Sequence, residues 1–222
     1  MFNKIIVAED LDSINIAVEQ ALKDFAIGEI IYSKYCDEAL LKMKRAFVDG
    51  CPFDLLITDL SFKADHRNEV LKEGEALIEA VKNLQPGIPI IVYSMEDRSY
   101  KIKSLFSDFG INGYIVKNRT SIPELKAAIL AIYAGKDKIL SKEISHVLND
   151  TTLLEIEAYD IELLKKISKG FQQDEIAQEF KNSGITPNSI STIEKRINKL
   201  KIYFKAQNNV HLIAITKDLG LI

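Results

Sequence analysis

The sequence predicts an α/β fold, a doubly wound parallel sheet of five strands, followed by a small all-α domain. From the N-terminus to about residue 130, short apolar runs alternate with helical patterns, as in a parallel sheet covered by helices on both faces. After about residue 153 only helical spacing continues. The 222 residues suffice for two small domains, and the apolar share of 47% is that of an ordinary globular protein. We therefore expect a first domain at residues 1–133, a linker at 134–153 and a second domain at 154–222.

Each expected strand is a short apolar run bounded by turns or polar residues. The runs cover residues 4–8, 29–32, 54–58, 88–93 and 113–116. The segments between them carry apolar residues at helical spacing, and one such pattern stops at Pro86-Gly87. In a sheet of this kind, ligands bind beyond the carboxyl ends of the strands.

Composition excludes several classes of protein. No apolar run approaches the ~20 residues of a membrane span, and no basic leader precedes the first strand, so a cytoplasmic protein without a membrane partner is expected. Cys36 and Cys51 are too few for a disulfide framework or a four-ligand metal site. The formal net charge is −3, yet residues 181–205 hold six lysines and arginines against Glu194 alone. This stretch is a local basic face in an acidic protein.

Polar side chains follow four of the five expected strands. Glu9 and Asp10 follow the first, Asp59 the third, Ser94 the fourth and Lys117 the fifth. The carboxyl ends of parallel strands meet at one edge of the sheet, so a single crevice would collect these groups. Polar residues are common at strand ends, so each of these residues alone is weak evidence. Three acids, a hydroxyl and an amine at the same edge together indicate a functional site.

That set suits the transfer of a phosphoryl group to a carboxylate. Carboxylate oxygens are the ligands that Mg²⁺ prefers, together with waters and phosphate oxygens. Asp59 can attack a phosphoryl group and form an acyl phosphate, and Mg²⁺ would neutralise charge on the transferring group. Lys117 would hold one phosphoryl oxygen as a point charge, and Ser94 would donate a hydrogen bond to another.

The motifs "AED", "LLITD", "IVYS" and "NGYIVK" resemble the receiver domain of two-component response regulators, which has a CheY-like, flavodoxin-like fold. The resemblance covers about residues 3–133. It implies a metal site formed by Glu9, Asp10, Asp59 and the backbone carbonyl of Ser61. It also implies that Asp59 is the phosphoacceptor, that Ser94 and Lys117 act on the phosphoryl group, and that Tyr114 is the switch aromatic.

The chain departs from the receiver pattern in three places. Residues 61–73 form a loop about seven residues longer than is usual, without a proline, and we expect it to alter the lifetime of the phosphoryl group rather than its acceptance. Met95 stands where the family prefers a small residue. Asn118 replaces the proline that follows the lysine in many receivers.

The second domain shows four helical patterns, of which the third carries the most information. We expect it to begin at Thr186-Pro187, a cap residue followed by proline at the first helical position. One narrow apolar stripe is expected to be buried and consists of Ile190, Ile193, Ile197, Leu200 and Phe204. The candidate DNA-binding residues lie away from that stripe and are Asn188, Ser191, Thr192, Lys195, Arg196 and Lys199.

Residues 154–219 resemble the LuxR-type helix-turn-helix of the NarL/FixJ response regulators, most closely in "LLKKISKGFQQDEIAQEF". The following stretch "KNSGITPNS" is about three residues longer than the family's turn, so the resemblance implies the docking mode but not the base contacts. The last helix dimerises in relatives, which implies a homodimer. Here its apolar face would consist of Val210, Leu212, Ile213, Ile215 and Leu219.

The sequence thus predicts a response regulator rather than a turnover enzyme. It would take a phosphoryl group from a sensor histidine kinase, with Mg²⁺ as cofactor, and regulate transcription by binding duplex DNA. A hydrolase of the haloacid dehalogenase type also forms an aspartyl phosphate, but it needs a second acid two residues after the nucleophile, where this chain has Ser61. A second alternative is a helical domain that docks a protein instead of DNA, because residues 154–222 are close to neutral overall.

Overall fold

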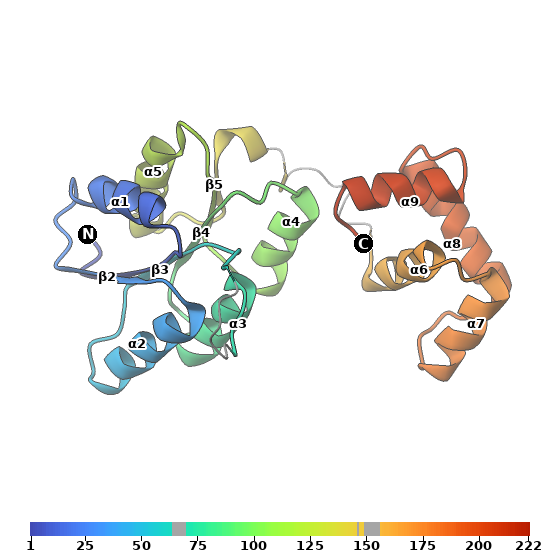
Figure 1. Ribbon diagram of the computed structural model, residues 1–222, viewed down its shortest axis with the longest axis horizontal. Helices are drawn as coiled ribbons and strands as arrows, with labels where there is room; N and C mark the ends of the chain where they lie inside the picture. The colour runs from blue at the N-terminus through green and yellow to red at the C-terminus, as the bar shows by residue number, and fades with distance from the viewer. Residues whose placement is uncertain (64–69, 146, 149–155) are drawn as a thin grey trace. The chain divides into compact units, whose positions relative to one another are not determined.

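The computed structural model describes residues 1–63, 70–145, 147–148 and 156–222. The chain divides into two units; in Figure 1 the sheet of the first lies between blue and yellow, and helices α6 to α9 of the second are orange to red. The first unit consists of Met1–Asp97 and Lys101–Val147, and the second of Arg98–Tyr100 and Leu148–Ile222. Among the described residues, no helix is both long enough and apolar enough to cross a bilayer.

The first unit is built on a parallel sheet with the order β2-β1-β3-β4-β5-β6. Its strands are β1 (Lys4–Ala8), β2 (Glu29–Ser33), β3 (Leu55–Thr58), β4 (Ile90–Ser94), β5 (Gly113–Val116) and β6 (Ile139–Leu140). The first five strands follow the order 2-1-3-4-5 that is typical of flavodoxin-like sheets. The predicted α/β class and the doubly wound parallel sheet are therefore confirmed.

The sheet has a sixth strand where the sequence predicted a linker. Ile139 and Leu140 pair in parallel with Gly113 and Tyr114 of β5, and the short 3₁₀ helix η1 (Lys142–Ile144) follows. The prediction of five strands was one strand short, because a two-residue strand has no detectable alternation. Ile139 and Leu140, which fall inside the predicted linker of residues 134–153, therefore belong to the sheet.

Five helices cover the two faces of this sheet. They are α1 (Asp12–Leu22), α2 (Cys36–Val48), α3 (Gly74–Leu84), α4 (Ser99–Asp108) and α5 (Ser121–Tyr133). Helices α1 and α5 lie side by side on one face, and α2 and α3 lie side by side on the other (Figure 1). Strands β3, β4 and β5 are buried along their whole length, which explains why they read as continuous apolar runs.

The second unit is all-helical. Its helices are α6 (Ala158–Ser168), α7 (Gln173–Asn182), α8 (Ile190–Tyr203) and α9 (Asn209–Asp218). Their apolar faces meet in a separate core of Leu163, Leu164, Ile176, Phe180, Ile193, Ile197, Leu200 and Leu212. Asn208 caps α9 by accepting a hydrogen bond from the His211 backbone N–H at 2.8 Å.

Helix α8 begins later than the sequence predicted. Its cap is Ser189, whose hydroxyl accepts from the Thr192 N–H at 3.3 Å, so the prediction of a start at Thr186-Pro187 was wrong. Ile190 is 50% exposed, although it was expected in the buried stripe. A helical side chain covers the turn that precedes its own Cα, and at the first residue of a helix no such turn exists.

Candidate functional site

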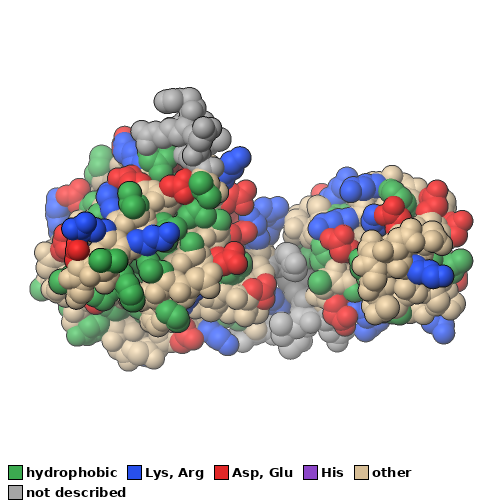
Figure 2. All heavy atoms as spheres, turned by 90° about the horizontal axis from the view of Figure 1, so that it is seen from below, with side chains coloured by type: hydrophobic (Ala, Val, Ile, Leu, Met, Phe, Trp, Pro, Cys, Tyr) green, Lys and Arg blue, Asp and Glu red, His purple; other side chains and the backbone are tan. Residues whose placement is uncertain are grey.

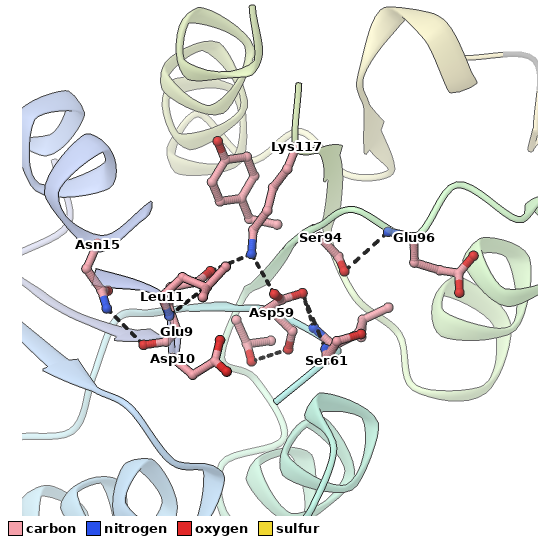
Figure 3. Close-up of polar contacts among 12 residues, drawn as sticks. Glu9, Asp10, Leu11, Asn15, Asp59, Ser61, Ser94, Glu96 and Lys117 are labelled. Atoms are coloured by element: carbon pink, nitrogen blue, oxygen red, sulfur yellow. Dashed lines mark hydrogen bonds and ion pairs between the residues drawn. The ribbon is translucent and has the colours of Figure 1, made fainter. Parts of the chain in front are cut away.

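Four neighbouring strands bring the predicted acids, hydroxyl and amine to one edge of the sheet (Figure 3). Glu9 and Asp10 follow β1, and Asp59 follows β3, its direct neighbour. Ser94 ends β4, and Lys117 follows β5. The Lys117 backbone N–H donates to the Ser94 carbonyl at 2.7 Å, which fixes the ends of these two strands to each other.

Lys117 joins two of the acids in a buried ion-pair cluster. Its Nζ lies 2.5 Å from Oε2 of Glu9 and 2.5 Å from Oδ2 of Asp59. The Lys117 side chain is only 5% exposed, so water screens these charges weakly. Burial raises the pKa of Glu9, and the hydrogen bond from Lys117 opposes that rise. One ammonium thus compensates two carboxylates that would otherwise repel each other.

The three acids form a group that fits a divalent cation. Glu9, Asp10 and Asp59 each offer one carboxylate oxygen, and these oxygens all lie within 4.8 Å of one another. Asp10 is less buried than the other two, so the group is open on that side. Several hard oxygen donors at one place are the ligand set of Mg²⁺ or Ca²⁺ rather than of a softer metal.

Backbone groups orient the carboxylate of Asp59. Its Oδ1 accepts from the Leu60 N–H at 2.6 Å and from the Ser61 N–H at 3.4 Å, while Oδ2 faces Lys117 (Figure 3). A hydrogen bond from the Asn15 amide to the Glu9 carbonyl, at 2.8 Å, holds the neighbouring strand end. Asn15 was not among the predicted site residues, because an asparagine in a helical pattern is ordinary.

Gly74 lets the start of α3 approach Asp59. A Cβ added at Gly74 would lie 1.9 Å from the Asp59 carbonyl oxygen, so only glycine fits between these backbones. The Gly74 N–H donates to the Leu60 carbonyl at 2.9 Å. The residues that flank the loop of residues 61–73 are therefore hydrogen-bonded to each other.

The described ends of that loop are attached to the rest of the domain. Ser61 pairs with Glu73 in an isolated antiparallel bridge, and the Lys63 N–H donates to Oδ2 of Asp10 at 2.9 Å. Residues 64–69 lie outside the described residues. The effect of the loop on phosphoryl lifetime and the role of the Ser61 carbonyl as a metal ligand stay predictions.

Ser94 and Tyr114 are both buried at this edge. The Ser94 hydroxyl accepts from the Glu96 N–H at 3.4 Å, and the Tyr114 hydroxyl donates to the Glu96 carbonyl at 2.7 Å. Burial raises the pKa of Tyr114, so its hydroxyl remains a neutral hydrogen-bond donor. Met95 is exposed beside them. The role of Tyr114 as a switch stays a prediction.

The second unit presents the predicted basic face on α8. Ser191, Lys195 and Lys199 are exposed, whereas Thr192 and Asn188 are half-buried. Within the part of the chain that the structure describes, neither Lys195 nor Lys199 pairs with an acid. Figure 2 shows basic and acidic side chains interspersed over the displayed face of each unit.

Arg196 is engaged elsewhere. Its Nε and a terminal nitrogen donate to the two oxygens of Asp160 at 2.5 and 2.6 Å, and the Asp160 side chain is 0% exposed. Asp160 raises the pKa of the Arg196 guanidinium. This bidentate pair joins α8 to α6. The predicted DNA contact of Arg196 would compete with it and stays a prediction.

Only part of the apolar face predicted for α9 is exposed to solvent. Leu212 is buried in the core of the second unit, and Val210 and Leu219 are exposed. Ile213 and Ile215 are half-buried. An exposed valine on this helix and an exposed leucine directly after it agree with a dimer interface, which stays a prediction.

No protein-family model matches the chain, and no curated protein does. Solved structures match across nearly its whole length. The RcsB response regulator of Salmonella typhimurium is 21% identical, covers 97% of this chain and 99% of its own, and superposes with a TM-score of 0.71. A structure of two RcsB dimers bound to two parallel DNAs gives 21% identity, coverage of 97% and 98%, and a TM-score of 0.64.

RcsB from Salmonella enterica serovar Typhimurium, bound to promoter DNA with the phosphomimetic BeF3−, gives similar values. It is 21% identical, covers 96% of this chain and 97% of its own, and has a TM-score of 0.63. The likeness therefore spans both units. The chain has the fold of these RcsB structures, a receiver fold followed by an all-helical domain.

Proposed function

We propose that the chain is a two-component response regulator of the NarL/FixJ family, phosphorylated on Asp59 by a sensor histidine kinase and regulating transcription by binding duplex DNA. The observation that carries the proposal is the buried group of Glu9, Asp59 and Lys117, held together by two 2.5 Å ion pairs. Similarity to RcsB structures that contain DNA and BeF3− supports it.

The first unit would act as the receiver. A carboxylate oxygen of Asp59 would form a bond to phosphorus as the phosphorus–nitrogen bond to the kinase histidine breaks. Lys117 would exchange its pair with Asp59 for a phosphoryl oxygen, and Ser94 would donate its hydroxyl proton to another. The receiver domain would extend beyond residue 133, through β6 and η1. The protein would be a regulator and not a turnover enzyme.

We assign the acidic group to Mg²⁺, held by Glu9, Asp10 and Asp59 with the Ser61 carbonyl. When bound, Mg²⁺ would neutralise charge on the transferring phosphoryl group. Glu9 and Asp59 already form ion pairs with Lys117. The Lys117 ammonium and Mg²⁺ would therefore both be attracted to the same two carboxylates.

The second unit would bind duplex DNA through α8, with Lys195 nearer the bases and Lys199 nearer the backbone. Residues near the N-terminus of a recognition helix usually sit deepest in the groove. Two copies would associate through α9. A cytoplasmic location and the absence of a membrane partner stay predictions.

Phosphorylation tests the receiver assignment. Incubation with acetyl phosphate and Mg²⁺ should add one phosphate to the wild type, detected by intact mass, and none after Asp59→Asn. Asp12→Asn, an exposed acid in the first turn of α1, is the matched control and should label normally. Chelation of Mg²⁺ should abolish labelling. Unchanged labelling of Asp59→Asn would refute the assignment.

DNA selection tests the output domain. Bound fragments selected from random duplexes would provide a site, with and without beryllofluoride. Lys199→Ala should then weaken binding about equally on all sequences and reduce the magnitude of the salt slope by roughly one. If Lys199 instead reads a base, the loss should be about 1–3 kcal/mol and confined to the selected site.

The double variant Lys195→Ala/Lys199→Ala should lose most of the affinity, whereas Lys169→Ala, an exposed lysine at the end of α6, is the control. A folded double variant with unchanged affinity would favour the alternative, a helical domain that docks a protein.

A further inference from the structure

The aromatic ring of Tyr93 lies beside the Lys117 ammonium. The Nζ of Lys117 lies 5.5 Å from the centroid of the Tyr93 ring, within the range of a cation–π contact. Tyr93 is buried in β4, directly before Ser94. Among the residues that the structure describes, Lys117 therefore has two carboxylate partners and one aromatic partner.

A chain of hydrogen bonds fixes the orientation of that ring. The hydroxyls of Tyr93 and Ser121 lie 2.7 Å apart, and the Ser121 hydroxyl donates to the Asn118 carbonyl at 2.8 Å. Because Ser121 has only one hydroxyl proton, Tyr93 must donate to Ser121. Asn118 directly follows Lys117, so the ring is tied to the same turn that carries the lysine.

The ring differs chemically from the other two partners of Lys117. Glu9 and Asp59 belong to the group that fits a divalent cation, so a bound cation competes with the ammonium for their charge. The face of a tyrosine ring attracts an ammonium through its quadrupole but supplies no oxygen ligand to a metal from that face. The ring can thus stay beside Lys117 whether or not the carboxylates are occupied.

We propose that Tyr93 is a positioning residue for Lys117. The Tyr93 ring keeps the Lys117 ammonium beside Asp59 when the ion pairs of Lys117 with Glu9 and Asp59 change. The inference rests on the proposed function, in which Lys117 binds a phosphoryl oxygen on Asp59. It assigns the positioning to the ring face, and the Tyr93 hydroxyl serves only to orient the ring.

A metal-free measurement tests the contact itself. Methylene protons of Lys117 near the ring face should resonate upfield of other lysines in a spectrum of ¹³C-lysine-labelled protein, and Lys117→Arg would assign the signal. Tyr93→Phe retains the ring and should retain the shift. Tyr93→Leu should remove it, and Tyr93→Met provides a second ring-free variant of flexible shape. Tyr133→Leu, an exposed tyrosine on α5, is the matched control.

Phosphorylation of the same full-length variants tests the consequence. With acetyl phosphate and saturating Mg²⁺, labelling of Tyr93→Leu and Tyr93→Met should slow by about threefold to thirtyfold, the size of a buried cation–π contact. Tyr93→Phe should label at nearly the wild-type rate. Thermal denaturation would show which variants are folded.

The outcomes separate the inference from the proposed function. Wild-type labelling speed in a folded ring-free variant would overturn the inference and leave Asp59 as the acceptor. Equal slowing in Tyr93→Phe would also overturn it, because the ring would then not be the determinant. Failure of the wild type to take a phosphoryl group on Asp59 would overturn both.

Discussion

Glu9 is buried at a cost to stability. Its carboxylate is almost inaccessible to water, and burial, the largest influence, raises its pKa above the ordinary value of 4.5 despite Lys117. The folded state therefore binds a proton at Glu9 more readily than the unfolded chain does. This group contributes most stability below pH 4.5, and the contribution is lost as the pH rises through the folded-state pKa.

Replacing Glu9 with glutamine should therefore stabilise the fold at neutral pH. In Mg²⁺-free buffer we expect Glu9→Gln to melt above the wild type at pH 7, with a difference that shrinks as the pH falls toward 4.5. Thermal denaturation across that range is the measurement, with Asp12→Asn as an exposed control. A difference that does not change with pH would contradict the explanation.

A second prediction at the scale of a single residue concerns Gly74. A Cβ there would meet the Asp59 carbonyl oxygen at 1.9 Å, and a backbone atom cannot move aside as a side chain can. Gly74→Ala should cost about 1–3 kcal/mol by overpacking and slow the labelling of Asp59. Gly87→Ala is the control, because nothing lies within 4 Å of its Cβ. Equal melting temperatures of the two variants would count against this explanation.

At the scale of elements, the sequence predicted best those strands whose burial requires a continuous run of apolar residues. The strands buried on both faces, such as β3 and β5, were continuous apolar runs, and their order placed Asp59 and Lys117 at one edge. The sequence failed where a single local hydrogen bond decides. Ser189 rather than Thr186 caps α8, and β6 is too short to have a period.

Arg196 shows why composition alone could not define the basic face. Three basic residues occur within five positions of α8, and only the structure shows that Asp160, on α6, engages one of them. Sequence spacing gives the face of a helix but not the partner that lies across from it. A DNA contact of Arg196 would have to compete with this pair, and the contact stays a prediction.

Removing Arg196 should destabilise the contact between α6 and α8. Arg196→Ala would leave the carboxylate of Asp160 buried without its bidentate partner, and breaking a buried pair in this way costs about 3 kcal/mol or more. Amide hydrogen exchange in α6 and α8 should accelerate, whereas exposed Lys195→Ala should change it little. Protection that survives Arg196→Ala would show that the pair is dispensable.

At the scale of the whole molecule, the two units divide the chemistry between them. Every residue of the proposed phosphoacceptor site lies in the first unit, and every proposed DNA contact lies in the second. Phosphorylation can change DNA binding only if it shifts a conformational or association equilibrium that DNA also senses. A fragment that contains the complete first unit should therefore be phosphorylated without the second unit.

The structure predicts that residues 1–147 form a complete phosphoacceptor domain and that residues 1–133 do not. The shorter fragment lacks β6, leaves the β5 edge open and loses the hydrogen bond from the Val116 N–H to the Ser141 hydroxyl, at 3.0 Å. It also lacks Ile144 and Val147, which are buried, and each buried aliphatic side chain contributes about 1.5–3 kcal/mol.

Fragment 1–147 should therefore label on Asp59 with acetyl phosphate and Mg²⁺, while fragment 1–133 should melt at a clearly lower temperature. Labelling of the shorter fragment should also be slower, because Lys117 directly follows Val116 and would depend on a strand end that has lost a neighbour. The matched variant Ser141→Ala in fragment 1–147 removes only the hydroxyl acceptor and should fall between the two fragments. If 1–133 and 1–147 melt together, β6 adds nothing to the domain, and the boundary expected from the sequence would be the correct one.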